Sequence, residues 1–210
     1  MAGAGTIAID FDAPTNSSFS DYFRVLLWDG SSTVASQETG KDTTFSAGVD
    51  QAGTYYVYID KADFHDDGQY GLTVTTSTGS VSNVETEDNG TLAKADTLTS
   101  GAKKTGQLSS SSDRDVYSIT MAGAGTIAID FDAPTNNSYS DYFRVLLWDG
   151  SSTVASQETG KDTTFSAGVD QAGTYYVYID KADFHDDGQY GLTVTTSTGS
   201  VSNVETEDNG

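Results

Sequence analysis

Apolar and polar residues alternate along most of the chain, in short runs broken by Gly, Asp, Asn and Ser. This period of two predicts β-strands, because successive side chains of a strand point to opposite faces. In residues 91–210 we predict strands near 104–108, 113–120, 124–132, 141–149, 152–158, 162–168, 172–180 and 188–196. The one helical element that we expect is a turn at 91–96.

Four rows of alternate apolar residues form the predicted core. They are Ile127, Ile129 and Phe131; Phe143, Val145 and Leu147; Tyr175, Val177 and Ile179; and Tyr190, Leu192 and Val194. Rows of this kind on two facing sheets build the core of a β-sandwich. Asp149-Gly150 between two strands is typical of a tight hairpin turn, since Gly tolerates a positive φ. We therefore predict an all-β chain of tandem antiparallel β-sandwich domains, similar to jelly rolls.

The sequence repeats itself almost without change. Residues 1–90 recur at 121–210, and the copies differ where Ser17 becomes Asn137 and Phe19 becomes Tyr139. We predict a β-sandwich repeat lacking its leading strands at 1–82, a complete repeat at 83–199, and the start of the next repeat or a linker at 200–210. Because Met1 aligns with the internal Met121, we interpret the sequence as a window of a longer tandem array.

The first copy has no counterpart of residues 91–120, which hold two predicted strands. An incomplete sandwich exposes unpaired backbone and is a template for strand addition. We therefore expect the partners to be other copies of the repeat, either the preceding repeat of a head-to-tail array or a filament neighbour, acting by strand complementation.

Composition narrows the classes of partner. The chain has 31 Asp and Glu against 10 Lys and Arg, a formal net charge of −21, which disfavours nucleic acid and anionic membranes. No segment approaches the roughly 18 consecutive apolar residues of a membrane helix, so we expect no membrane insertion. The absence of Cys excludes disulfides, thiolate nucleophiles and Cys-based zinc sites.

Acidic residues gather in two segments of each repeat. Glu85, Glu87, Asp88 and Asn89 put three carboxylates and an amide oxygen within five residues. Such hard oxygen ligands suit calcium better than zinc or copper, while a solvated acidic linker is the alternative. Asp180, Asp183, Asp186 and Asp187 surround His185, but their spacing does not fit an EF-hand, and we favour a polar hairpin loop over the alternative of metal binding. For Asp130 and Asp132 we favour a solvated outer strand face.

No motif predicts catalysis. Each copy holds a single His, and the chain shows neither a nucleophile-elbow motif nor a Gly-rich phosphate loop. Tyr176 and Tyr178 share a face with Leu146 and Trp148 if their strands are neighbours. One interpretation of such a stripe is a binding platform for sugar or protein. We favour the other interpretation, in which these residues pack in the core or between repeats. Asn16, Asn89 and Asn136 match the N-glycosylation pattern.

Six segments in order carry a family resemblance: VETEDNGTLAKADTL, SSDRDVYSI, AGAGTIAIDF, YFRVLLWDG, AGTYYVYI and GQYGLTV. Together they resemble the bacterial pre-peptidase C-terminal domain, a family related to the collagen-binding domains of collagenases. The resemblance implies a secreted β-sandwich appended to larger proteins, commonly with calcium at its N-terminal linker. The implied ligands are Glu85, Glu87, Asn89, Asp113, Asp115 and Tyr190, with Glu205, Glu207 and Asn209 in the next copy.

These features together predict a structural segment of an extracellular bacterial fibre or fibrillar adhesin, with calcium-stiffened joints between repeats and no catalysis. Its high negative charge would keep an exposed array soluble at the cell surface or in the medium. The alternative is a carbohydrate- or collagen-binding accessory module of a secreted hydrolase. The fibre predicts visible filaments, whereas the accessory module predicts measurable affinity for a ligand.

Overall fold

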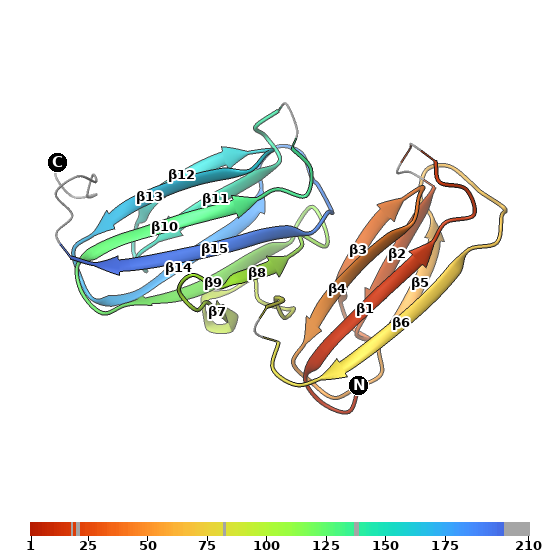
Figure 1. The fold of residues 1–210 in the computed structure, drawn as a ribbon, viewed down its shortest axis with the longest axis horizontal. Coiled ribbons are helices and arrows are strands. Elements are labelled where there is room, and N and C mark those ends of the chain that lie inside the picture. Colours follow the sequence, from red (N-terminus) through yellow and green to blue (C-terminus); the bar gives the residue numbers. More distant parts are fainter. Residues whose placement is uncertain (18, 20–21, 82, 137–138, 200–210) are drawn as a thin grey trace. The chain divides into compact units, whose positions relative to one another are not determined.

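The computed structural model describes residues 1–17, 19, 22–81, 83–136 and 139–199 (Figure 1). These fall into two compact units, Met1–Asp88 and Asn89–Gly210, which we call unit 1 and unit 2. The predicted boundary at 82/83 lies a few residues earlier, and the predicted end segment 200–210 lies outside the described residues. Each unit is described separately below.

Unit 2 consists of two facing sheets. In strand order, the first contains β13 (Thr163–Val169), β10 (Gly125–Asp132), β15 (Tyr190–Thr198) and β8 (Lys103–Gly106). The second contains β12 (Thr153–Thr159), β11 (Phe143–Trp148), β14 (Gly173–Lys181), β9 (Arg114–Met121) and β7 (Asp96–Thr97). All eight predicted strands are confirmed within a few residues, and they pair antiparallel. The additional strand β7 runs parallel to β9.

Two short elements, η1 (Leu92–Lys94) and β7, lie at the start of unit 2. The predicted helical turn is the 3-10 helix η1, which ends on a basic residue. The strand β7 was not predicted, because its two residues are too few to show a period. The described part of the chain contains no helix long and apolar enough to cross a membrane.

The core of unit 2 is the predicted one. Every residue of the four apolar rows is buried, and the ring of Phe131 packs against Phe143 and Tyr190 with centroids 5.1 and 5.3 Å apart. Gly150 has a φ of 101° in the hairpin turn, where the carboxylate of Asp149 accepts hydrogen bonds from the N–H groups of Ser151 and Ser152. The antiparallel β-sandwich fold is therefore confirmed.

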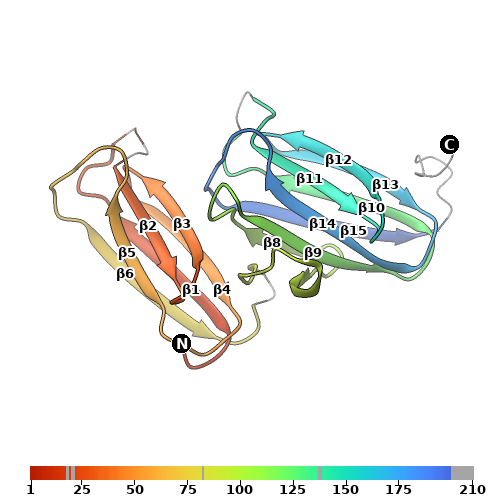
Figure 2. The same ribbon diagram turned by 180° about the vertical axis from the view of Figure 1, so that it is seen from behind.

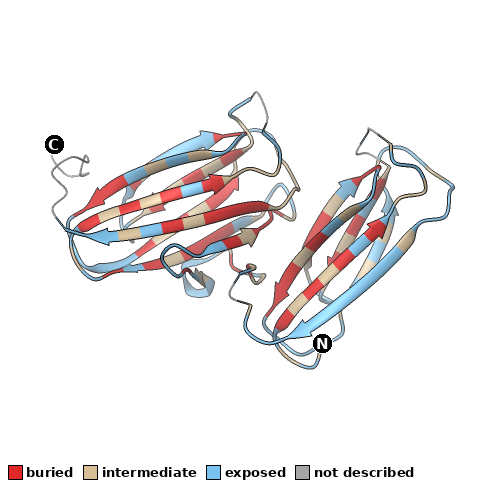
Figure 3. Cartoon of the chain, viewed as in Figure 1, coloured by how far each residue is buried: buried red, intermediate tan, exposed pale blue. Residues whose placement is uncertain are grey.

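Unit 1 contains two three-stranded sheets with the same pairings. The first holds β4 (Thr43–Val49), β1 (Gly5–Asp12) and β6 (Gly71–Thr78), and the second β3 (Thr33–Thr39), β2 (Phe23–Trp28) and β5 (Tyr56–Lys61). Within the described residues of unit 1 there is no counterpart of β7, β8 or β9, so β6 and β5 are edge strands (Figure 2). Figure 3 shows the consequence, because β6 is exposed along most of its length whereas β15 carries buried residues.

Candidate functional site

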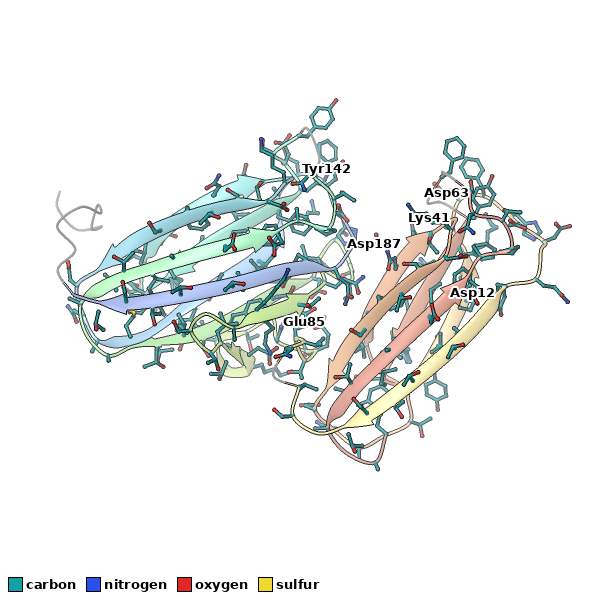
Figure 4. All side chains as sticks on the ribbon, viewed as in Figure 1. Asp12, Lys41, Asp63, Glu85, Tyr142 and Asp187 are labelled. Atoms are coloured by element: carbon teal, nitrogen blue, oxygen red, sulfur yellow. The ribbon has the colours of Figure 1, made fainter. Side chains whose placement is uncertain are left out.

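The first candidate site is a group of three acids. Glu85, Glu87 and Asp115 each place a carboxylate oxygen within 4.8 Å of the other two, and this is the one such group of His, Cys, Asp or Glu in the described residues. Glu85 and Asp115 are buried, and Glu87 is half-buried. Figure 4 shows the side chain of Glu85 in its surroundings. The structure thus brings together acids that lie far apart in the sequence.

Both parts of the group are held by β-structure. The carbonyl oxygen of Glu85 accepts a hydrogen bond from the N–H of Gly48 at 3.1 Å, and Thr86 forms a parallel bridge with Gly48 on β4. Asp115 points inward from β9, because it alternates with the outward Arg114. The hydroxyl of Tyr190 donates to Asp115 Oδ2 at 2.5 Å and lies 2.7 Å from the hydroxyl of Tyr117. Buried hydrogen bonds therefore fix the position of the Asp115 carboxylate.

The carboxylate and amide oxygens of this segment suit a metal ion that prefers oxygen ligands. Two carboxylates at this separation repel by about 3.5 kcal/mol at an effective dielectric of 20, and burial raises the cost of each charge. Asn89, which is fully buried, adds an amide oxygen to the same acidic segment. Glu87 Oε1, Asn89 Oδ1 and Asp115 Oδ1 are buried oxygen atoms that accept no hydrogen bond, although each residue has other interactions. The buried group is able to hold a cation.

The remaining implied ligands are Asp113, Tyr190 and three residues of the next copy. The carboxylate of Asp113 accepts hydrogen bonds from the N–H and hydroxyl of Ser109 at 2.6 and 2.7 Å, within a tight turn before β9. Tyr190 contacts the group as a donor to Asp115. Glu205, Glu207 and Asn209 lie outside the described residues.

The N-glycosylation matches differ in accessibility. Asn89 is fully buried, so its side chain is closed to a glycan in this fold. The amides of Asn16 and Asn136 are exposed, and each donates to an aspartate, Asp42 and Asp162 respectively, at 3.2 Å.

The second acidic segment is a polar loop that connects the two sheets of unit 2, because β14 and β15 lie in different sheets and do not pair, so the prediction of a hairpin was wrong. Asp186 accepts a hydrogen bond from the N–H of Gly188 at 2.9 Å, and His185 Nε2 lies 2.8 Å from the carbonyl oxygen of Leu108. Grouping Asp180 with this loop was wrong, because Asp180 lies on β14 and is buried. The predicted strand 172–180 already includes Asp180, but its ion pairs could not be predicted, because Arg114 and Arg144 lie on other strands.

The outer strand faces that we expected to be solvated differ from each other. Asp130 is exposed and accepts a hydrogen bond from the hydroxyl of Thr164 at 2.9 Å. Asp132 is half-buried, and its carboxylate forms an ion pair of 2.6 Å with Lys103 of β8.

The second candidate site is the outer face of the five-stranded sheet. Leu146 lies opposite Tyr178 and Trp148 opposite Tyr176, which confirms that their strands are neighbours. All four side chains are half-buried on the outside, so the interpretation as core was wrong. A depression of about 190 Å³ on this face is lined by Arg114, Arg144, Leu146, Trp148, Tyr178 and Asp180.

Two arginines of this depression, Arg114 and Arg144, form ion pairs with the same aspartate, Asp180. Arg144 donates to Asp180 through Nε at 2.9 Å and through an Nη at 2.6 Å, while Arg114 Nε lies 3.4 Å from the same carboxylate. The hydrogen bonds to Asp180 raise the pKa of Arg144 further above its ordinary value. The guanidinium of Arg114 also lies 5.8 Å from the centre of the Tyr178 ring, within range of a cation–π contact. The face therefore offers aromatic rings beside fixed hydrogen-bond donors.

No family model and no curated protein sequence matches the chain. Among solved structures, it is similar to the pre-peptidase C-terminal domain of a collagenase from Bacillus anthracis (27% identity, 48% of this chain and 94% of that one, TM-score 0.39). It is also similar to Aeromonas hydrophila PliG, a periplasmic inhibitor of g-type lysozyme (9%, 49% and 96%, TM-score 0.36). A third similar structure holds the tandem CBM51 modules of a family 98 glycoside hydrolase from Streptococcus pneumoniae (11%, 93% and 78%, TM-score 0.33). The first of these is a domain of the family that the sequence motifs resemble.

Proposed function

We propose that the chain is a non-catalytic accessory module of a secreted protein, which binds a carbohydrate or a collagen-like polypeptide on the outer face of its five-stranded sheet. The observation that carries the proposal is the depression that places Trp148 and Tyr178 beside Arg114 and Arg144. Aromatic rings pack against the apolar faces of sugars and proline rings, and a guanidinium held in place donates to hydroxyl or carbonyl oxygens. A few fixed polar groups on an apolar lining are typical of ligand sites.

Binding of the full chain to immobilised polysaccharides and to collagen tests this function. Unit 1 carries Trp28 and Tyr58, the counterparts of Trp148 and Tyr178, although its described residues hold no counterpart of Arg114. The variant therefore replaces both tryptophans, Trp28→Ala with Trp148→Ala. We expect affinity to fall by about tenfold or more, as for aromatic residues at the centre of an interface. The matched control replaces exposed aromatic residues away from the face, Phe64→Ala with Phe184→Ala. Equal affinity of both variants, or no binding to either ligand class, would contradict the proposal.

We further propose that the cation held by Glu85, Glu87 and Asp115 is calcium. All donors are oxygen atoms, and calcium accepts six to eight such ligands in flexible geometry, whereas magnesium requires a smaller octahedral shell with several waters. Bound calcium would supply positive charge to a buried anionic group. The side chains of this chain would orient it, with Tyr190 holding Asp115 in position.

Thermal unfolding of the full chain with calcium, magnesium or chelator tests the metal. A ligand at one hundred times its Kd stabilises the folded state by about 2.7 kcal/mol, so calcium should raise the melting temperature by several degrees. Glu87→Gln should abolish this rise. Asp88→Asn, at the exposed neighbouring residue, should keep it. A melting curve that does not change with calcium in the native chain would refute the site.

The near-identity of the two copies favours a second candidate function, a segment of an extracellular fibre or fibrillar adhesin. Repeats that differ at two positions suit a role in which every unit does the same mechanical work. In this function calcium would stiffen the acidic segment 84–89 at the start of the complete repeat. Electron microscopy of concentrated chain, with and without chelator, should then show filaments that lose their straightness when calcium is removed.

A further inference from the structure

The strand β4 lies at one edge of the first sheet of unit 1, with β1 on its other side. An edge strand offers backbone N–H and C=O groups to a further segment of chain. On β4 these groups meet the acidic segment. The N–H of Gly48 donates to the carbonyl oxygen of Glu85 at 3.1 Å, and Thr86 forms a parallel bridge with Gly48. The segment 84–86 therefore adds to β4 as a very short parallel strand.

Gly48 stands at a position of β4 where a side chain would point outward. Phe45, Ala47 and Val49 alternate with it and belong to the core of unit 1. Thr44 has the same outward phase as Gly48 and is exposed, whereas Gly48 is buried. Another part of the chain thus covers the outward face at Gly48, and the contacts above identify that part as the acidic segment.

The close approach of the segment requires a glycine at this position. A Cβ on Gly48 would collide with the carbonyl oxygen of Glu85, and it would lie 3.1 Å from the carbonyl carbon of Glu85 and 3.2 Å from Cγ2 of Thr86. The first two atoms belong to the backbone, so no change of rotamer can move them away. A glycine inside a strand often marks such an approach of a second backbone. Any larger residue would push Glu85 away from β4.

A displaced backbone would carry metal-binding side chains with it. Glu85 is 5% exposed and offers a carboxylate oxygen within 4.8 Å of those of Glu87 and Asp115. Glu87 directly follows the bridged Thr86, so pairing with β4 fixes the backbone that bears both glutamates. Ligands of a binding site must be held within about 0.5 Å of their productive geometry. The pairing with β4 therefore acts on the site through the backbone rather than through a side chain.

We propose that Gly48 is a positioning residue of the cation site, and that cation binding is coupled to the pairing of segment 84–86 with β4. The paired backbone favours the cation, and the cation favours the paired backbone by the same factor, because such coupling is reciprocal. The inference rests on the proposed calcium site and adds its regulation, since a change that frees the edge of β4 weakens the metal. Bound calcium in turn keeps this edge covered, which protects it from pairing with another chain.

Calorimetric titration of the full chain with calcium tests the positioning role. Gly48→Ala should raise the Kd for calcium at least about tenfold, since loss of an outer partner of a metal ligand typically costs about 10–100-fold in affinity. The matched control is Gly168→Ala, which makes the same change at the same position of β13, a strand that carries none of the three acids. This control should leave the Kd unchanged. Circular dichroism in chelator establishes that each variant is folded before the titration.

Hydrogen exchange in the native chain supplies a test that needs no variant. The N–H of Gly48 donates to Glu85, so it exchanges when the segment separates from β4. Calcium should slow the exchange of this amide by at least about tenfold, the same factor as in the titration, and should leave the amide of Gly168 unchanged.

Two results would overturn this inference and leave the calcium site in place. One is a native Kd for calcium in Gly48→Ala, and the other is equal slowing of the Gly48 and Gly168 amides by calcium. If the native chain binds no calcium in the titration, the site itself is refuted, and the coupling is refuted with it.

Discussion

Leu72 and Leu192 provide a matched pair for measuring what β8 and β9 contribute to stability. Both residues occupy the same position of the repeat, opposite Phe11 and Phe131 respectively. Leu192 is fully buried beneath the strands of the leading segment, whereas Leu72 is 41% exposed. Replacing each leucine by alanine therefore removes the same atoms from two different environments.

The magnitudes follow from the two environments. Leu192→Ala leaves a cavity in a closed core, and such substitutions cost about 2.7–5 kcal/mol, so we expect about 3 kcal/mol. Leu72→Ala removes a side chain that is already partly hydrated and opens a notch to solvent. Burying a leucine fully is worth about 1.5–3 kcal/mol, so the partial burial of Leu72 corresponds to about 1 kcal/mol. The expected difference of about 2 kcal/mol exceeds the usual error of denaturant titrations.

The free energy of unfolding of both variants, measured by denaturant titration and by calorimetry, checks this expectation. Ile9→Val and Ile129→Val form the control pair, because both isoleucines are fully buried. Each should cost about 1 kcal/mol, and the two costs should be equal. Suppose that Leu72→Ala and Leu192→Ala lower the free energy of unfolding equally, and that the two isoleucine variants also do so. This result would refute the argument that the leading segment buries Leu192 in unit 2 and leaves Leu72 in unit 1 less buried.

Three further outcomes follow from the same structure. Arg144→Ala should cost about 2 kcal/mol because it leaves the buried Asp180 with a weaker partner, whereas Arg24→Ala, whose contact with an exposed Asp60 is 3.5 Å long, should cost under about 0.5 kcal/mol; both are checked by denaturant titration. Hydrogen bonds from Ser152 and Ser151 hold the pKa of Asp149 at about 2, below its ordinary 3.8, so the stability that Asp149 contributes is complete above pH 3.8 and is lost as the pH falls through about 2. Asp149→Ala should therefore cost about 1 kcal/mol at pH 7, a value reduced by solvent screening, and almost nothing below pH 2 in an acid titration of stability. Gly106→Ala should lower the melting temperature by several degrees, because a Cβ there would collide with the hydroxyl groups of Tyr117 and Tyr190.

The period of two was sufficient to predict the strands and the core of unit 2, because alternation is a local property of each strand. The rows from Ile127 to Phe131 and from Tyr190 to Val194 are buried as predicted. The same alternation places Trp148 on the face opposite Leu147, so its interpretation as core conflicted with the predicted row. The ion pairs of Asp180 were missed because the sequence does not show which strands are neighbours. Side chains paired across strands depend on register, which a single sequence does not state.

Some residues of the candidate metal group could be predicted from the local sequence, and one could not. Glu85 and Glu87 are adjacent acids whose oxygen chemistry can be recognised locally. Asp115 was implied by a family resemblance, and its burial beside Tyr117 and Tyr190 comes from the pairing of β9 with β14. Alternation does not separate Asp115 from Asp113, because both have the phase of Tyr117; they differ because β9 begins at Arg114 and leaves Asp113 in the preceding turn.

The two copies also separate what a strand does by itself from what its neighbours add. The pairings of β1 with β4 and β6 are the same as those of β10 with β13 and β15, although unit 1 lacks β8 and β9 in its described residues. The register of these central strands is therefore set by their own apolar pattern and turns. The segment 91–121 instead decides which apolar residues are buried, and it carries Asp115 into the acidic group. One segment thus supplies both the closing strands of the sandwich and a carboxylate of the candidate metal centre, so substitutions in β9 should alter stability and metal binding together, whereas substitutions in β13 should alter stability alone.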